Sequence, residues 1–298
     1  MSKSRRELGA WLIAVVGVVA LFAAVIAPAA VGQEESPGDA SSAPRAPHQA
    51  SVGGDASLQA SATAVGGPVV IMGIDAEDGG VGSHGPASAY AGIVTSLSDL
   101  TKNGGAGMLV LGGGKSPTDD VTEFWDEVST LTGIPATYAN GAAVATQSFS
   151  GFRIVAVVSG DDETSGGGLD AAECAALAAR QQDFFDFVNA GGGLVAFAQD
   201  VVGGAGCEYA FFGGFGAFTF TVGQSFGDIT ATPAGTAAGV SDDLDVCCWH
   251  DTYQTFPSFL EALALANDSG DEGSFGQVAA IGGASVVIGG QPVVKFTG

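Results

Sequence analysis

Continuous apolar runs alternate with stretches of helical periodicity from residue 68 onward. Four runs lack the polar alternation of a half-exposed strand, which is typical of strands buried on both faces of a sheet. They cover residues 69–74, 108–111, 152–158 and 193–197, and a shorter strand is predicted near 136–138. Between them, apolar residues recur at helical spacing over 90–100, 121–131 and 170–189. This alternation predicts an α/β domain with a mostly parallel sheet and helices on both faces, in three layers.

Local signals predict where these helices begin and end. Asp170 and Glu173 have the spacing of a capping box, with Asp in place of Ser or Thr. Residues 116–120 contain a proline and two acids, which favours a helix start there, and Gly133 is expected to end that helix. Gly191 is expected to end the helix over 170–189.

The last third of the chain has a different pattern. Residues 218–222 alternate like a strand with one exposed face. Ser258 and Glu261 predict the start of a short helix over 259–266. Closing strands are predicted over 278–281, 285–288 and 293–296. We therefore expect antiparallel strands to be added to the sheet near the C-terminus.

The N-terminal 32 residues are expected to be a targeting segment. Lys3, Arg5 and Arg6 precede an apolar run, and small residues follow it, as in a secretory signal peptide. The run approaches membrane-spanning length, so an uncleaved anchor through residues 8–27 is the alternative. In both cases the positive-inside rule predicts an extracytoplasmic location, secreted or anchored. Residues 33–66 are rich in Ser, Ala, Gly and Pro and predict a flexible linker before the α/β domain at 67–298.

The acidic balance of the chain limits its partners. The chain has nine Lys and Arg residues and 32 Asp and Glu residues, which gives a formal net charge of -23. Nucleic-acid binding rests on basic side chains that neutralise phosphates, so nucleic acid is not expected as a partner. Cations and neutral ligands remain compatible with this charge.

Four cysteines follow the targeting segment. An oxidising compartment permits disulfides, and Cys207 with Cys247 or Cys248 is the expected pair. Cys174 lies in a helical apolar pattern, and we expect it to be a buried thiol. No C-x-x-C spacing is present, which disfavours a cysteine zinc site.

Polar or glycine-rich segments follow each of the four long strands. In α/β sheets, ligands bind beyond the carboxyl ends of the strands, so these segments are expected to share one edge. The candidate ligand-binding residues collected in this way, together with a late His-Asp pair, are Asp75, Glu77, His84, Lys115, Glu163, Gln199, His250 and Asp251.

Three carboxylates in this set suggest a cation. Asp75, Glu77 and Asp78 lie within four residues, and hard cations such as Ca²⁺ take several oxygen ligands. A general acid/base pair and a solvated turn are the alternatives. Lys115 is expected to pair with the cluster around Asp75 or Glu163. The His250-Asp251 pair is suited to general base work, to metal binding or to a structural role.

The glycines before Lys115 resemble a phosphate-binding loop only superficially. That motif requires a glycine where Leu109 stands. A strand-to-helix turn that brings the backbone close to its neighbours is the preferred interpretation of residues 112–115.

One unit resembles a known superfamily. The helix followed by FVNAGGGLVAF at 187–197 is similar to the corresponding unit of class I glutamine amidotransferase-like domains, and the 69–75 strand, residues 112–114 and His250 follow in the same order. The resemblance implies a flavodoxin-like fold. It also implies a nucleophilic cysteine after the 193–197 strand, where this chain has Ala198, Gln199 and Asp200. The chain would then be a member of the superfamily without amidotransferase activity.

These observations predict a non-catalytic extracytoplasmic domain that binds a cation, a sugar or a cell-surface partner at the carboxyl edge of the sheet. The alternative is an exported hydrolase that uses a carboxylate/His site, with or without a metal.

Overall fold

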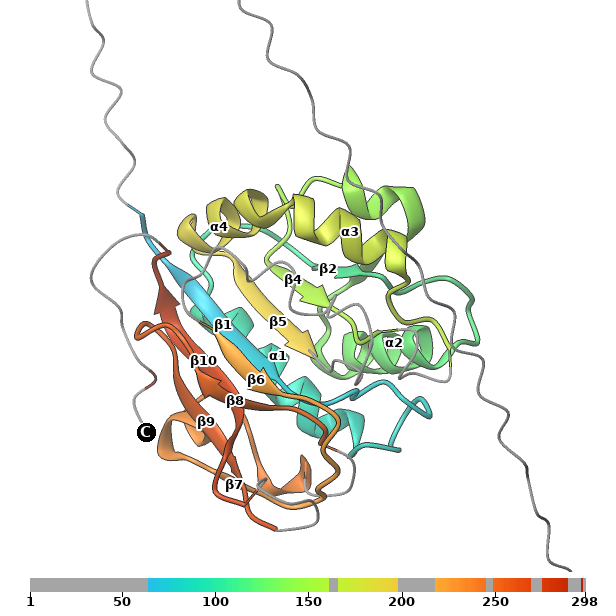
Figure 1. Ribbon diagram of the computed structural model, residues 1–298. Coiled ribbons are helices and arrows are strands. Elements are labelled where there is room, and N and C mark those ends of the chain that lie inside the picture. Colours follow the sequence, from blue (N-terminus) through green and yellow to red (C-terminus); the bar gives the residue numbers. More distant parts are fainter. Residues whose placement is uncertain are drawn as a thin grey trace, which may run out of the picture. The chain divides into compact units, whose positions relative to one another are not determined.

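Five parallel strands form one part of a mixed sheet, in the order β3-β2-β4-β5-β1 (Figure 1). The computed structural model describes residues 64–160, 166–197, 218–244, 249–268, 275–288 and 296. The strands are β1 (Gly67–Met72), β2 (Met108–Leu111), β3 (Ala136–Ala139), β4 (Ile154–Val157) and β5 (Gly193–Phe197). Except for β3, every residue in them is buried, which agrees with the continuous apolar runs of the sequence.

Antiparallel strands extend the sheet beyond β1. The long strand β10 (Val278–Val286) pairs with β1, and β8 (Thr252–Thr255) and β6 (Thr219–Thr221) continue that side. Strand β9 (Glu261–Ala266) also pairs with β10, and β7 (Ile229–Ala231) pairs with β9. The predicted class, a mostly parallel α/β sheet with antiparallel strands near the C-terminus, is confirmed. Within that class, the order of the parallel strands differs from the order 2-1-3-4-5 of flavodoxin.

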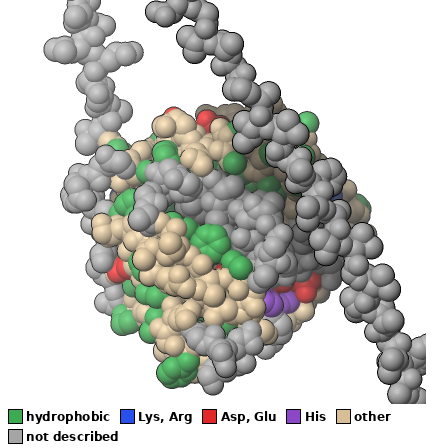
Figure 2. All heavy atoms as spheres, viewed as in Figure 1, with side chains coloured by type: hydrophobic (Ala, Val, Ile, Leu, Met, Phe, Trp, Pro, Cys, Tyr) green, Lys and Arg blue, Asp and Glu red, His purple; other side chains and the backbone are tan. Residues whose placement is uncertain are grey.

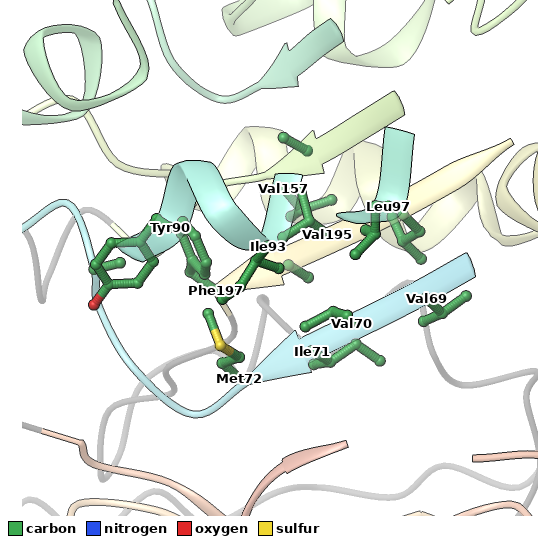
Figure 3. Packing of buried hydrophobic residues seen from close by; sticks show 14 of the residues in the cluster. Val69, Val70, Ile71, Met72, Tyr90, Ile93, Leu97, Val157, Val195 and Phe197 are labelled. Carbon is green, nitrogen blue, oxygen red and sulfur yellow. The ribbon is translucent and has the colours of Figure 1, made fainter. Parts of the chain in front are cut away.

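Helices cover both sides of the parallel strands (Figure 1). One side carries α1 (Ala87–Leu100) and α2 (Asp120–Thr132), and the other carries α3 (Ala171–Ala179) and α4 (Gln181–Asn189). Short helices η1 (Gly141–Ala145), α5 (Pro233–Ala237) and η3 (Asp242–Leu244) lie in the connections. Figure 3 shows β1 side chains packed toward Tyr90, Ile93 and Leu97 of α1.

Each side of the sheet carries its own cluster of aromatic side chains. Phe197, the last residue of β5, contacts Tyr90 and Phe124 edge-on and stacks on Trp125, on the side of α1 and α2. On the side of α4, Phe184 packs against Phe149. Each helix layer therefore has its own apolar contact with the sheet, as a three-layer arrangement requires.

The predicted helix ends are confirmed. The Asp170 side chain accepts the backbone N–H of Glu173, and the Glu173 side chain accepts the N–H of Asp170, which completes the capping box. Gly133 ends α2 in the left-handed conformation, with φ of 66°. The helix predicted over 170–189 is interrupted at Arg180, which separates α3 from α4.

The helix predicted over 259–266 is wrong. These residues form strand β9, because β9 lies between β7 and β10 and both neighbours satisfy its backbone groups. Pairing with two strands outweighs the helix propensity of the Ala- and Leu-rich segment. The two strands predicted over 278–281 and 285–288 are one continuous strand, β10. The strand predicted over 293–296 lies outside the described residues, apart from Phe296.

The expectation of a free thiol at Cys174 is also wrong, because Cys174 forms a disulfide. The other three cysteines lie outside the described residues, and so does the expected pairing of Cys207. The targeting segment and most of the linker lie outside them too. In the part that is described, none of the helices has the length and apolar character to cross a membrane.

Candidate functional site

Strand β1 leads directly to the first candidate residue, Asp75. Gly73 follows the strand, and its carbonyl oxygen accepts the backbone N–H groups of both His250 and Asp251, at 2.9 and 3.0 Å. Ile74 bridges to Trp249 in the antiparallel sense. The chain at 73–75 and the chain at 249–251 therefore run side by side. This pairing places Asp75 next to His250, although the two residues are far apart in the sequence.

His84 reaches the same place through a folded loop between β1 and α1. The loop begins with a turn in which the Asp78 N–H donates to the Asp75 carbonyl oxygen at 2.9 Å. It closes where the Tyr90 hydroxyl of α1 donates to the carbonyl oxygen of His84. Gly85 has a φ of 99°, a conformation that glycine adopts without steric cost, and this turns the chain into α1.

Three side chains converge there. The Asp75 Oδ1 atom lies 3.3 Å from Nε2 of His84 and 3.7 Å from Nε2 of His250. One ligand atom from each residue lies within 4.8 Å of the others. Asp75 and His84 are only 3% and 4% exposed, whereas the His250 side chain is 23% exposed. The group is therefore buried on two sides and reaches solvent at His250. Figure 2 shows histidine at the surface of one face, next to Asp or Glu side chains.

Backbone contacts fix the position of one proton on each of the two rings. Nδ1 of His84 lies 3.0 Å from the Asp78 carbonyl oxygen, and Nδ1 of His250 lies 2.8 Å from the Gln224 carbonyl oxygen. A carbonyl oxygen only accepts, so each Nδ1 carries the proton. In a neutral imidazole, Nε2 then presents its lone pair. In the neutral form of both rings, the two Nε2 lone pairs therefore face the carboxylate of Asp75, and the three residues present three electron-pair donors.

Glu77 lies near this group but has its own partners. It is fully buried; Oε1 accepts the indole N–H of Trp125 at 3.0 Å, and Oε2 accepts the hydroxyl of Ser159 at 2.8 Å. Burial raises the pKa of Glu77 to about 7, against the opposing effect of these hydrogen bonds. The pKa of Tyr90 is also raised, first by burial and then by the charges of Glu77 and Asp75. The charges of both carboxylates therefore act on the Tyr90 hydroxyl.

The remaining candidates are placed as follows. Asp78 contributes its backbone carbonyl to His84, and Asp251 is fully buried beside His250. The converging set is thus Asp75 with two histidines, rather than the three carboxylates of the 75–78 segment. Lys115 does not join it. Its ammonium group pairs with Glu173 at 2.8 Å and donates to the Gly168 carbonyl oxygen. Glu163 and Gln199 lie outside the described residues.

The glycine segment after β2 is closely packed. A Cβ atom at Gly112 would lie 2.5 Å from the Leu169 side chain, and one at Gly114 would lie 2.4 Å from the Tyr138 side chain. These glycines allow the backbone to approach its neighbours, which agrees with the strand-to-helix turn predicted from the sequence.

The sequence placed His84 and His250 at the same edge of the sheet, but it assigned the cation to Asp75, Glu77 and Asp78 and did not combine the two histidines with Asp75 as ligands of one ion. His84 is a candidate because of its loop after the first strand, and His250 because of its acidic neighbour. One signal was present. His84 follows the acidic 75–78 segment in the loop after the first strand, and His250 directly precedes Asp251; both segments were expected at the edge of the sheet. That signal does not by itself specify that the two segments meet.

Comparisons of the chain with protein-family models, with curated proteins and with solved structures found no match.

Proposed function

We propose that this chain is an extracytoplasmic domain that holds a divalent cation at the carboxyl edge of its sheet and binds a ligand or surface partner there. The observation that carries the proposal is the convergence of Asp75, His84 and His250, with both Nδ1 atoms engaged by backbone carbonyls. Three electron-pair donors that face one another repel, and a cation among them turns that repulsion into attraction.

Two features support the extracytoplasmic location. The first is the basic, then apolar pattern of residues 1–32. The second is the disulfide at Cys174, since disulfides persist in oxidising compartments and are rare in reducing ones.

The charge of the chain favours some ligands over others. A net charge of -23 repels anionic partners and attracts cations. A carbohydrate or another neutral component of a cell surface is compatible with this field, and a bound cation offers coordination positions to its hydroxyl groups. We therefore propose a neutral ligand, with carbohydrate as the leading class.

Thermal unfolding of the purified chain tests cation binding. A ligand that binds only the folded state raises the melting temperature as its concentration exceeds the dissociation constant. Wild type should melt at a higher temperature with a divalent cation than with excess chelator, and Asp75→Asn should lose this difference. The exposed Asp99 of α1 supplies a matched control, because Asp99→Asn removes the same charge and should keep the wild-type response. Equal melting of wild type with cations and with chelator would rule the proposal out.

A second candidate is a metal-assisted hydrolase. The observation that favours it is the partial exposure of His250, since three protein ligands and a solvent-facing side allow a metal-bound water to meet a substrate. The two candidates differ in turnover. The cation-loaded protein should hydrolyse a neutral ester or glycoside if it is an enzyme, and should leave all of them intact if it only binds. Loss of any turnover in His250→Ala would assign it to this site.

The relationship to class I glutamine amidotransferase-like domains is part of the proposal as well. The unit of α4, Gly191 and β5 supports it, because a helix, a glycine turn with φ of 95° and a buried strand follow one another as in the resemblance. The strand order, with β1 beside β5 and β10, argues against a close relationship.

A further inference from the structure

We infer that the cation of this site belongs to the zinc class of transition metals, and that Nε2 of His84, Nε2 of His250 and a carboxylate oxygen of Asp75 bind it and leave one position open to solvent. The inference rests on the proposed function and specifies its cofactor. It replaces the expectation of Ca²⁺ that the acidic segment at 75–78 suggested.

The donor atoms favour this class of ion. Ca²⁺ takes six to eight oxygen ligands, and Mg²⁺ also prefers oxygen. Two of the three convergent donors are imidazole nitrogens, which suit Zn²⁺, Cu²⁺, Fe²⁺ and Ni²⁺. Glu77 could have supplied further oxygens, but its two carboxylate oxygens are engaged by Trp125 and Ser159. The set that remains is two nitrogens and one carboxylate.

The distances from Asp75 to the two histidine nitrogens fit a small ion. Around a tetrahedral ion with bonds of about 2.0 Å, two ligand atoms lie about 3.3 Å apart. The separations of Asp75 Oδ1 from the two Nε2 atoms are 3.3 and 3.7 Å. A charge-assisted hydrogen bond between such atoms is shorter, at about 2.7–2.9 Å. The separations are thus closer to those between ligands of one ion than to those of direct hydrogen bonds.

The two imidazole rings have the hydrogen-bond partners that are typical of metal-bound histidines. A metal-bound histidine commonly donates its other ring N–H to a backbone carbonyl or a carboxylate, which fixes the tautomer and aims the ligand nitrogen. Here Asp78 supplies that carbonyl to His84, and Gln224 supplies it to His250. The carbonyls belong to two separate segments, and each holds one ring. The ligand nitrogens are therefore positioned before any ion binds.

The fourth position faces the side of His250. Asp75 and His84 are nearly fully buried, so they close the inner side of the site. His250 is the partly exposed member, and its solvent-facing side is where a water or an exogenous ligand would complete the coordination. The same opening would admit a hydroxyl or carbonyl oxygen of a neutral ligand.

Titration calorimetry of the metal-free full chain with Zn²⁺, Co²⁺ and Ca²⁺ tests the inference. Wild type should bind one equivalent of Zn²⁺ or Co²⁺, and a large excess of Ca²⁺ should not displace it. His84→Ala and His250→Ala should each weaken Zn²⁺ binding by more than about 100-fold, because loss of an outer partner alone costs about 10- to 100-fold. His48→Ala is the control for removal of a histidine and should bind Zn²⁺ like wild type.

The absorption spectrum of the Co²⁺ form reports the geometry. Four-coordinate Co²⁺ has intense visible bands that six-coordinate Co²⁺ lacks, and azide should shift them by entering the open position. His84→Ala removes a buried ring, so its fold is checked by circular dichroism. The more exposed His250→Ala keeps the test decisive if His84→Ala does not fold.

The outcomes separate this inference from the proposed function. If Ca²⁺ raises the melting temperature through Asp75 while Zn²⁺ binds equally well to wild type and His250→Ala, the cation function stands and the zinc-class centre is refuted. If no divalent cation binds, both fail, and the group is a hydrogen-bonded cluster of protonated histidines around Asp75. A Co²⁺ spectrum of purely six-coordinate character, unaffected by azide, would refute the open four-coordinate site.

Discussion

Gly73→Ala is expected to lower the free energy of unfolding by roughly 3 kcal/mol or more, which is at the upper end of single substitutions. A Cβ atom at this position would lie 2.1 Å from the carbonyl oxygen of Asp251 and 2.7 Å from its carbonyl carbon. These are backbone atoms, so no side-chain rotation relieves the contact. The chain at 249–251 has to move away from β1, and the hydrogen bonds from His250 and Asp251 to the Gly73 carbonyl oxygen weaken.

Because the same contact places His250 beside Asp75, metal binding should weaken together with stability. Urea unfolding measures the first effect, and Zn²⁺ titration under native conditions measures the second. Gly92→Ala is the matched control. Gly92 lies in α1, and a Cβ atom there would have only the Gly239 carbonyl oxygen nearby, at 3.7 Å. Alanine in a helix should stabilise the chain by about 0.5–1 kcal/mol. A Gly73→Ala protein with wild-type stability and Zn²⁺ affinity would contradict the described pairing.

Trp125→Ala is expected to cost about 4 kcal/mol, as large-to-small changes of buried aromatic residues do. Trp125 is fully buried in α2, stacks on Phe197 at 5.3 Å between ring centroids and contacts Phe124 at 5.4 Å. Its indole N–H also donates to Glu77, so the substitution leaves a cavity and removes a donor from a buried carboxyl group. The loop that carries Asp75 and His84 contains Glu77, and its position should become less well defined.

Trp125→Phe separates the two contributions. It keeps most of the ring packing and removes the N–H group, so we expect a smaller loss of about 1–3 kcal/mol. The hydrogen bond from Trp125 lowers the pKa of Glu77, so its removal should raise that pKa further. Chemical unfolding of wild type, Trp125→Ala and Trp125→Phe in the presence of a chelator measures their stabilities. If Trp125→Phe and Trp125→Ala lowered the free energy of unfolding equally, packing of the Trp125 ring would contribute little, contrary to the expectation.

The class of fold could be predicted from the sequence because its signals are local. Buried parallel strands need apolar residues on both faces, and this produces continuous runs that are visible without a structure. The capping box at Asp170 and the glycine at 133 act within one turn of their helix, so the structure reproduces both. The rule that ligands bind at the carboxyl ends of the strands also directed attention to Asp75 and His84.

Segments whose structure depends on distant partners were decided by the tertiary structure. The 261–266 segment has helix-forming residues, yet it is strand β9 because β7 and β10 lie on either side of it. The site follows the same principle. Asp75, His84 and His250 could each be singled out in the sequence. They meet only because the chain at 73–75 pairs with the chain at 249–251. The carbonyl oxygens of Asp78 and Gln224 then orient the two histidine rings. The sequence determined which donors were present and at which edge of the sheet. Only long-range backbone hydrogen bonding decided which of these donors face one another. The residues next to a strand end in the sequence do not specify which distant segment will pair with it.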